Sequence, residues 1–111
     1  MPTKRAKRRL IAWIREQVRQ GEYLIKMHAR QRMSERGIWI ADVENALLTG
    51  RVIEDYPFDP RGHSCLVLGE DRAGRWLHVV CNVSTDLLAI VTAYYPEEQQ
   101  WIDYKVRIGG E

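Results

Sequence analysis

The nine residues Arg75-Trp76-Leu77-His78-Val79-Val80-Cys81-Asn82-Val83 decide the fold of this chain. Successive side chains of a β-strand point to opposite faces, so residues two apart share a face. One alternate set is entirely apolar and predicts a face turned to a core: Leu77, Val79, Cys81 and Val83. The other set is mixed and places His78 on the less apolar face, with Trp76, Val80 and Asn82.

Similar segments lie on both sides of this strand along the chain. Ser64–Gly69 precedes it across a turn at 70–74, and Leu87–Tyr95 follows it across a turn at 84–86. Arg51–Tyr56 is a fourth candidate, followed by a loop that contains two prolines. Short turns join antiparallel neighbours, so these segments predict a meander of four antiparallel strands.

The amino-terminal half has helical periodicity instead. Residues 4–19 carry apolar side chains at helical spacing, and Gly21 follows as a helix-ending residue. Tyr23–Met27 is a short apolar segment that suits a brief strand. A helix from His28 is expected to end at Gly37, and another to run from Ala41 or Asp42 to Thr49. The expected architecture is α+β: two or three N-terminal helices packed on one face of a four-stranded antiparallel sheet.

Length and composition fit a single soluble domain. The chain has 111 residues, of which 45% are hydrophobic and 29% charged. We expect a basic N-terminal helical extension over residues 1–22 and one α+β domain over residues 23–111. The sequence lacks both an apolar run of about 20 residues and a secretory signal, which predicts a cytoplasmic protein without a membrane partner. Cys65 and Cys81 are then expected to be buried thiols.

The net charge of +2 hides a strong asymmetry. Residues 1–36 hold eleven Lys or Arg and three acidic residues, whereas the remainder holds six basic and twelve acidic ones. A basic segment of this kind is typical of nucleic-acid binding, and we expect Arg8 and Arg9 to contact RNA. The alternative is a basic helix that is simply balanced by an acidic sheet.

His28, Arg32 and Arg36 follow one another at intervals of four, so they share one face of a helix. Like charges at this spacing repel, and the arrangement makes sense when an anion such as a phosphodiester lies over them. A solvated basic face is the simpler interpretation.

His78 adds a second imidazole on the less apolar face of the sheet, where an antiparallel neighbour can bring Thr92 or Tyr94 beside it. Two histidines and a cation can supply a general base, a general acid and charge stabilisation for phosphoryl transfer. A half-buried histidine bonded to a backbone carbonyl is the alternative. A metal site is not expected, because His78 and Cys81 are three apart in a strand and point to opposite faces.

The helical segment also carries a family resemblance. The runs His28-Ala-x-x-Arg32-Met33-x-x-Arg36-Gly37-Ile38 and Asp42-Val43-x-x-Ala46-Leu47-x-x-Gly50 resemble a bacterial family known only as domain of unknown function 4258. The strand motifs Leu77-His78-Val79-Val80 and Val91-Thr92-Ala93-Tyr94-Tyr95-Pro96 follow in the same order, and the similarity spans about residues 23–101. Trp39 replaces the Ser or Thr expected before the second helix of the motif, which leaves capping to Asp42.

That family is grouped with small toxin ribonucleases of the barnase, EndoU, colicin and RelE-like class. The resemblance implies a RelE-like fold and metal-independent RNA cleavage without a cofactor, by attack of the 2′-hydroxyl on the adjacent phosphate. His28 and His78 would be the acid and base, Arg32 and Arg36 would hold the phosphate, and Thr92 and Tyr94 would position phosphate or base. The implied partners are RNA, free or ribosome-bound, and a cognate antitoxin protein, in some members one with a zinc-binding module.

Two other functions remain open from the sequence. One is a nucleic-acid-binding or protein-interaction module without catalysis, which would use the same basic helices. The other is a structural or regulatory subunit that docks through the acidic second half. Aromatic residues such as Trp39, Tyr56 or Tyr94 would stack on unpaired bases in an RNA-binding protein.

Overall fold

The computed structural model describes residues 3–84, 86–97, 101–102 and 106–107. These residues form three helices, a five-stranded sheet and a separate two-stranded ribbon. The helices are α1 (Lys4–Gln20), α2 (Met27–Glu35) and α3 (Ile40–Thr49). The strands are β1 (Tyr23–Ile25), β2 (Arg51–Tyr56), β3 (Ser64–Glu70), β4 (Trp76–Asn82), β5 (Leu88–Tyr94), β6 (Trp101–Ile102) and β7 (Val106–Arg107).

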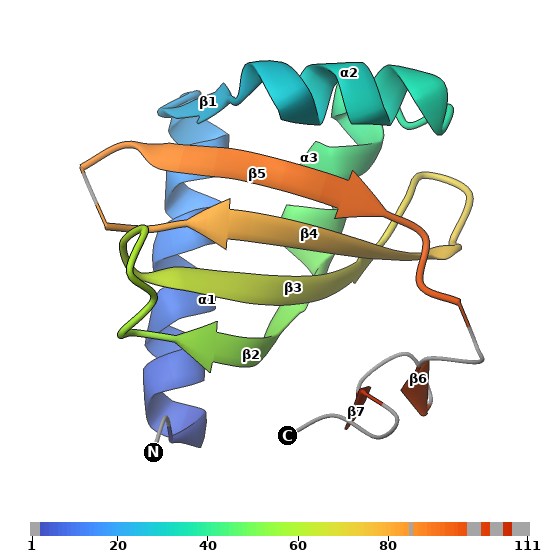
Figure 1. The fold of residues 1–111 in the computed structure, drawn as a ribbon. Helices are drawn as coiled ribbons and strands as arrows, with labels where there is room; N and C mark the ends of the chain where they lie inside the picture. Colours follow the sequence, from blue (N-terminus) through green and yellow to red (C-terminus); the bar gives the residue numbers. More distant parts are fainter. Residues whose placement is uncertain (1–2, 85, 98–100, 103–105, 108–111) are drawn as a thin grey trace.

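The main sheet has the order β1-β5-β4-β3-β2 (Figure 1). Strands β2 to β5 form the expected antiparallel meander. The prediction of a four-stranded, purely antiparallel sheet is wrong, because β1 adds a fifth strand parallel to β5, with Leu24 opposite Ala89. Three residues of β1 are too few to reveal, from sequence alone, a partner more than sixty positions away. The fold is therefore α+β with a mixed sheet.

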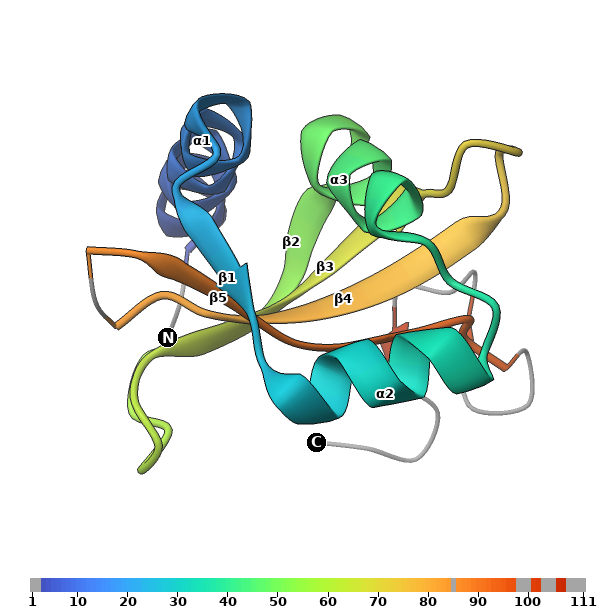
Figure 2. The same ribbon diagram turned by 90° about the horizontal axis from the view of Figure 1, so that it is seen from above.

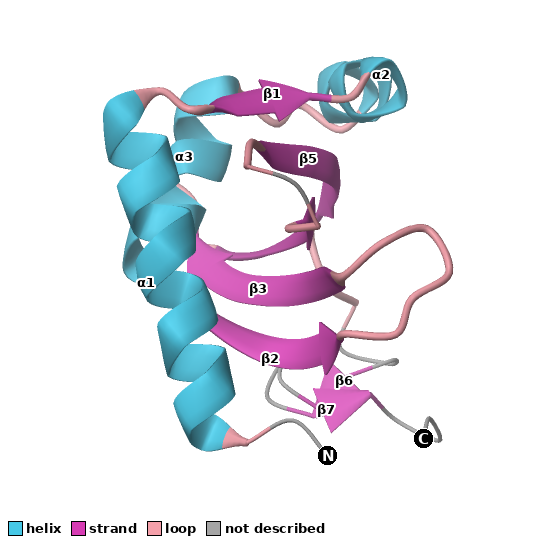
Figure 3. Cartoon of the chain, turned by 90° about the vertical axis from the view of Figure 1, so that its left-hand side faces the viewer, coloured by secondary structure: helices cyan, strands magenta, loops and turns pink. Residues whose placement is uncertain are grey.

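The sequence predicted that all helices cover one face of the sheet, and this prediction is wrong. Helices α1 and α3 lie together on one face, which we call the helix face (Figure 2). Helix α2 instead runs along β5 at the edge of the sheet and projects on the other side, which we call the open face (Figures 2 and 3). The loop between β2 and β3 projects on this same side (Figure 3). Since β1 joins the sheet edge beside β5, the chain that continues into α2 must follow that edge.

The hydrophobic core lies between the sheet and the α1–α3 layer. Leu77, Val79 and Cys81 are fully buried there, as the alternation of β4 predicted. Their partners from α1 are Ile11, Ile14 and Val18, which form its apolar stripe. The basic N-terminal helix is thus packed into the same core as the rest of the domain.

The ends of the helices follow local sequence signals. The Thr3 hydroxyl caps α1 by accepting a hydrogen bond from Ala6 N, and Gly21 ends the helix in the left-handed conformation with φ of 71°. Asp42 caps α3 by accepting a hydrogen bond from the Trp39 backbone N–H at 3.2 Å, so the expected role of Asp42 is confirmed. None of the described helices combines the length and apolar character needed to cross a membrane.

Candidate functional site

The open face of the sheet brings the histidine of β4 and the hydroxyl residues of β5 side by side. The β4–β5 register pairs His78 with Tyr94 and Val80 with Thr92. Residues paired across antiparallel strands share a face, so all four side chains belong to the face opposite Leu77 and Val79. The placement of His78 beside Tyr94, left open by the sequence, is thereby decided.

His78 is completely buried, with 0% of its surface exposed. Its Nδ1 lies 3.2 Å from the Tyr94 hydroxyl oxygen, and the two rings meet edge to face with centroids 5.2 Å apart. Tyr94 is only half-buried and lines a pocket that His78 does not reach. Of this pair, the tyrosine is therefore the more exposed member, and the imidazole is buried behind it.

Arg36 connects α2 to the same strand. It follows the last turn of α2, and its Nη1 donates to the carbonyl oxygen of Ala93 at 2.8 Å and to Thr92 Oγ1 at 3.4 Å. These bonds place a guanidinium beside Thr92, at the edge of the open face. Part of its donor capacity is used to hold α2 against β5.

His28 and Arg32 lie on the flank of α2 that leads to Arg36. Ala29 and Met33 point to the core. His28 directly precedes Ala29 and Arg32 directly precedes Met33, so each basic side chain is rotated by about 100° around the helix from a buried one. Because Arg36 reaches Thr92 on the open face, His28 and Arg32 line the same rim two turns and one turn earlier. Both side chains are exposed, and among the described residues they make no hydrogen bond or ion pair.

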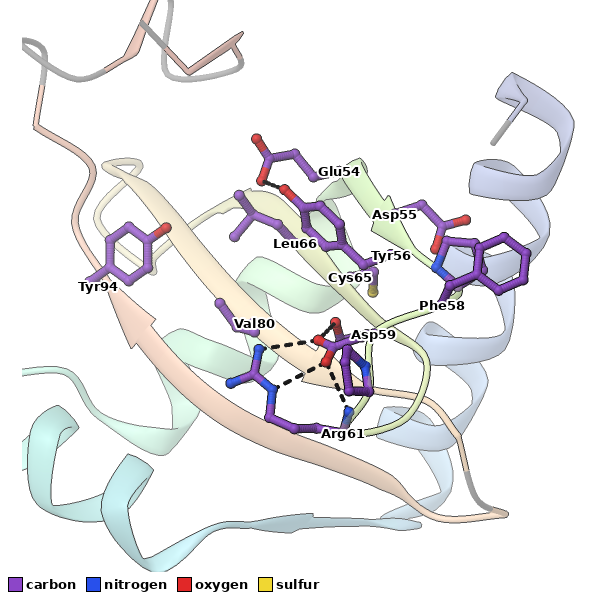
Figure 4. A pocket seen from close by; sticks show the side chains of 13 residues that line it. Glu54, Asp55, Tyr56, Phe58, Asp59, Arg61, Cys65, Leu66, Val80 and Tyr94 are labelled. Carbon is purple, nitrogen blue, oxygen red and sulfur yellow. Dashed lines mark hydrogen bonds and ion pairs between the residues drawn. The ribbon is translucent and has the colours of Figure 1, made fainter. Parts of the chain in front are cut away.

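A pocket of about 570 Å³ opens next to Tyr94 (Figure 4). Leu66 of β3 and Val80 of β4 form its floor, and Tyr94 stands on the β5 side. Tyr56, at the end of β2, stands on the opposite side, and Phe58 of the following loop lies beyond it at the outer margin. We call this cavity the β2–β3 pocket.

Asp59 holds the loop at the rim of this pocket. Its carboxylate accepts hydrogen bonds from the Arg61 backbone N–H, from two atoms of the Arg61 guanidinium, and from Ser64 Oγ at 2.7 Å. The Arg61 guanidinium, with smaller help from the Arg61 N–H and the Ser64 hydroxyl, holds the pKa of Asp59 far below its usual range. The Asp59 carboxylate is therefore negatively charged at neutral pH and can accept all of these hydrogen bonds.

The RNA-binding candidates of α1 lie apart from this site. Arg8 and Arg9 are exposed on a helix that covers the opposite face of the sheet (Figure 2). A groove of about 610 Å³ between α1 and β2 is lined by Lys4, Lys7, Arg8 and Arg51 over an apolar floor. The structure thus has two separate cationic regions instead of one.

The cysteines belong to the core and not to a site. Cys65 and Cys81 lie opposite each other on β3 and β4, and both are buried free thiols, as expected. A hydrogen bond with Cys65 and burial raise the pKa of the Cys81 thiol well above its ordinary value. Within the described part of the chain, no group of three or more His, Cys, Asp or Glu side chains is placed to hold a metal ion.

Sequence reasoning missed the loop side of the open face. For Phe58, Asp59 and Arg61 the sequence pattern predicts only a loop that contains two prolines. A usable signal was present, since an aromatic residue between Pro57 and Pro60 is held in a stiff, exposed segment. The pairing of His63 Nε2 with Asp55 Oδ1, at 2.6 Å, was also missed.

Comparison with known proteins gives one match. Neither a curated protein nor a solved structure matches this chain. The family model described as "Domain of unknown function (DUF4258)" matches residues 25–95, which include α2, α3 and the four-stranded meander and exclude α1. The match confirms the family expected from the His28–Ile38 and strand motifs. On this basis the chain belongs to the DUF4258 family.

Proposed function

We propose that this protein is an endoribonuclease of the toxin type, with its active site on the open face between α2 and β5. The proposal rests on two hydrogen-bonded pairs that meet on β5. Arg36 donates to Thr92, and Tyr94 is hydrogen-bonded to His78. The exposed His28 and Arg32 line the adjacent rim. The assignment follows the ribonuclease function that the sequence motifs of this family imply.

Cleavage of RNA needs a base, an acid and positive charge around one phosphate. The base removes the proton of the 2′-hydroxyl, the 2′-oxygen attacks phosphorus, and the bond to the 5′-oxygen breaks. The acid protonates that 5′-oxygen, leaving a 2′,3′-cyclic phosphate and a 5′-hydroxyl end. Cations stabilise the additional negative charge of the pentacoordinate state.

The chain offers candidates for these roles, spread along the rim over two turns of α2. His28 contributes an exposed imidazole, which is the proposed proton-transfer group. Arg32 and Arg36 lie along the same flank and supply the charge. Tyr94 presents a hydroxyl to the phosphate, and His78 acts as a positioning residue that fixes this hydroxyl from behind.

The proposed substrate is single-stranded RNA, either free or on the ribosome, and the proposed partner is a cognate antitoxin that blocks this face. A flexible strand can lie across the sheet face from which α2 and the β2–β3 loop project (Figure 3), and its unstacked bases are accessible to protein side chains.

Induced expression with parallel mapping of RNA 5′-ends tests the proposal. The wild type should arrest growth and create new RNA ends with 5′-hydroxyl groups. His28→Ala and Tyr94→Phe should abolish both effects, and His78→Ala should weaken them. Gln31→Ala is the matched control, since Gln31 is exposed on the side of α2 that points away from the buried Ala29 and Met33. Normal growth and unchanged RNA ends with abundant folded wild-type protein would overturn the assignment.

A non-catalytic RNA-binding module is the second candidate, favoured by the cationic groove on α1. Lys4, Lys7, Arg8 and Arg51 line it without an acidic residue among its lining side chains. In that case His28→Ala leaves RNA affinity unchanged, whereas Arg8→Ala combined with Arg9→Ala lowers affinity and reduces the salt dependence by about one counterion per lost contact. A nuclease that also uses this groove would lose activity in both experiments.

A further inference from the structure

We infer that the β2–β3 pocket holds one unpaired nucleobase of the bound RNA strand. The inference rests on the proposed function for the identity of the ligand as RNA. It adds a base-binding site, on the side of Tyr94 that faces away from α2, to the phosphate-binding rim described above.

The lining of the pocket suits a flat, largely apolar ring. Tyr56, Phe58 and Tyr94 contribute three aromatic side chains from three different segments, above a floor of Leu66 and Val80 (Figure 4). Stacking on aromatic side chains is the usual means by which proteins hold unpaired bases. The volume of about 570 Å³ is ample for one base and its ribose.

Phe58 provides the most specific signal. Its side chain is 94% exposed, the largest exposure among the apolar side chains of the described residues. The loop that carries it is fixed by the four hydrogen bonds that Asp59 accepts and by backbone bonds from Asp59 to Tyr56 and from Gly62 to Asp59. An aromatic ring exposed to water on a hydrogen-bonded loop is available to stack, and the ordered loop backbone reduces the entropy that is lost on binding.

The charges around the pocket favour a base over a phosphate. Glu54, Asp55 and Asp59 all line it, and Arg61 is the only cation among its lining residues. The Arg61 guanidinium is already paired with Asp59, at 3.1 Å from Nε to Oδ1. Phosphate is therefore repelled from the pocket and attracted to the Arg32–Arg36 rim, whereas a neutral base is tolerated. The planar Arg61–Asp59 pair adds a further stacking surface at the rim.

The position of Tyr94 links the two subsites. It contacts His78 at the proposed cleavage site and also forms one side of the β2–β3 pocket. A strand whose phosphate lies at the α2 rim would thus direct a neighbouring base into the pocket. Purines should be preferred to pyrimidines there, because a larger ring system buries more surface against the aromatic walls.

A single fluorine reports directly on the pocket. The chain contains one phenylalanine, so growth with 4-fluorophenylalanine labels Phe58 alone. The labelled protein is titrated with a 2′-O-methyl oligoadenylate, which cannot be cleaved because its 2′-oxygen is blocked. An abasic oligonucleotide of the same length and charge is the matched ligand. We expect a saturable ¹⁹F shift with the oligoadenylate and none with the abasic strand.

Substitutions of Phe58 measure how much its ring contributes to oligoadenylate affinity. Phe58→Ala should weaken oligoadenylate binding at least about 5-fold, the lower range for loss of one base–aromatic stack. Phe58→Trp should retain the affinity, and Leu48→Ala, an exposed apolar residue of α3, should not change it. Because Phe58 is nearly fully exposed, these substitutions do not disturb the core.

The outcomes separate this inference from the proposed function. Two results would refute the base-binding pocket and leave the nuclease assignment intact. One is an equal ¹⁹F shift with the abasic strand, and the other is binding of oligoadenylate without any ¹⁹F shift. Failure of any RNA to bind overturns both the pocket and the nuclease assignment. A base-dependent shift in a protein that never cleaves RNA supports the pocket and rejects the nuclease.

Discussion

Gly69→Ala is expected to destabilise the domain strongly, although it adds only one methyl group. Gly69 lies on β3 where α3 crosses the sheet most closely. A Cβ at this position would be 2.6 Å from the carbonyl carbon of Ala46, 2.7 Å from its Cα, and nearer still to its carbonyl oxygen. Real Cβ atoms essentially never approach within 3.0 Å, and these neighbours are helix backbone, which cannot rotate away.

The cost follows from the movement that this clash requires. Restoring an ordinary contact distance of 3.4 Å to the carbonyl carbon displaces α3 from the sheet by at least 0.8 Å, and the nearer carbonyl oxygen requires a larger shift. A gap of this size removes a quarter to a half of the dispersion energy between the side chains of α3 and the sheet. The α3 residues affected are Val43 and Leu47, and burial of each side chain contributes about 1.5–3 kcal/mol. Together with overpacking strain of about 1–3 kcal/mol, the expected loss is about 3 kcal/mol. Domains of this size have total stabilities of about 5–15 kcal/mol.

Urea unfolding followed by tryptophan fluorescence measures this loss. The midpoint should fall while the slope of the transition stays constant. Ala46→Gly serves as a partner variant, because the clash involves the backbone of Ala46 and not its methyl group. The double variant should be at least as unstable as Gly69→Ala. A loss below about 1 kcal/mol, or rescue by Ala46→Gly, would refute the close approach of α3 and β3.

Three further predictions concern buried or hydrogen-bonded groups. Burial and a hydrogen bond to Glu44 raise the pKa of Tyr23 from 10.0 to about 12, so this bond contributes stability that is fully present below pH 10 and is lost as the pH rises towards 12. Absorbance titration at high pH should show a late-ionising tyrosine that Tyr23→Phe removes. Cys65 and Cys81 should resist a thiol reagent in the folded protein and react stoichiometrically in urea; rapid reaction of the native protein would contradict their burial. Asp42→Ala should cost about 1 kcal/mol or more through loss of the α3 cap and of the two hydrogen bonds that Asp42 accepts from Arg72, whereas an unchanged urea midpoint would show that these contacts are dispensable.

Much of the fold is readable from local sequence patterns. The periodicity of residues 4–19, the glycines after the helices and the alternation of β4 are determined by steric rules acting within a few residues. The same alternation separated His78 from Leu77 and Val79 correctly. Four-residue spacing also placed His28, Arg32 and Arg36 on one flank of α2, since a helix fixes the relative direction of its own side chains.

The arrangement of the candidate site depends on contacts that no local pattern contains. The parallel pairing of β1 with β5, and the course of α2 along the sheet edge that follows from it, arise between segments far apart in the chain. The complete burial of His78 and the β2–β3 pocket beside Tyr94 result from packing among β2, β3, β4 and β5. The sequence by itself determined which residues are helical, which are extended and which face each side chain takes, because these depend on backbone geometry. Only the tertiary structure decided which helix and strand faces pack against each other, because this packing depends on how several distant segments bury their apolar surface together.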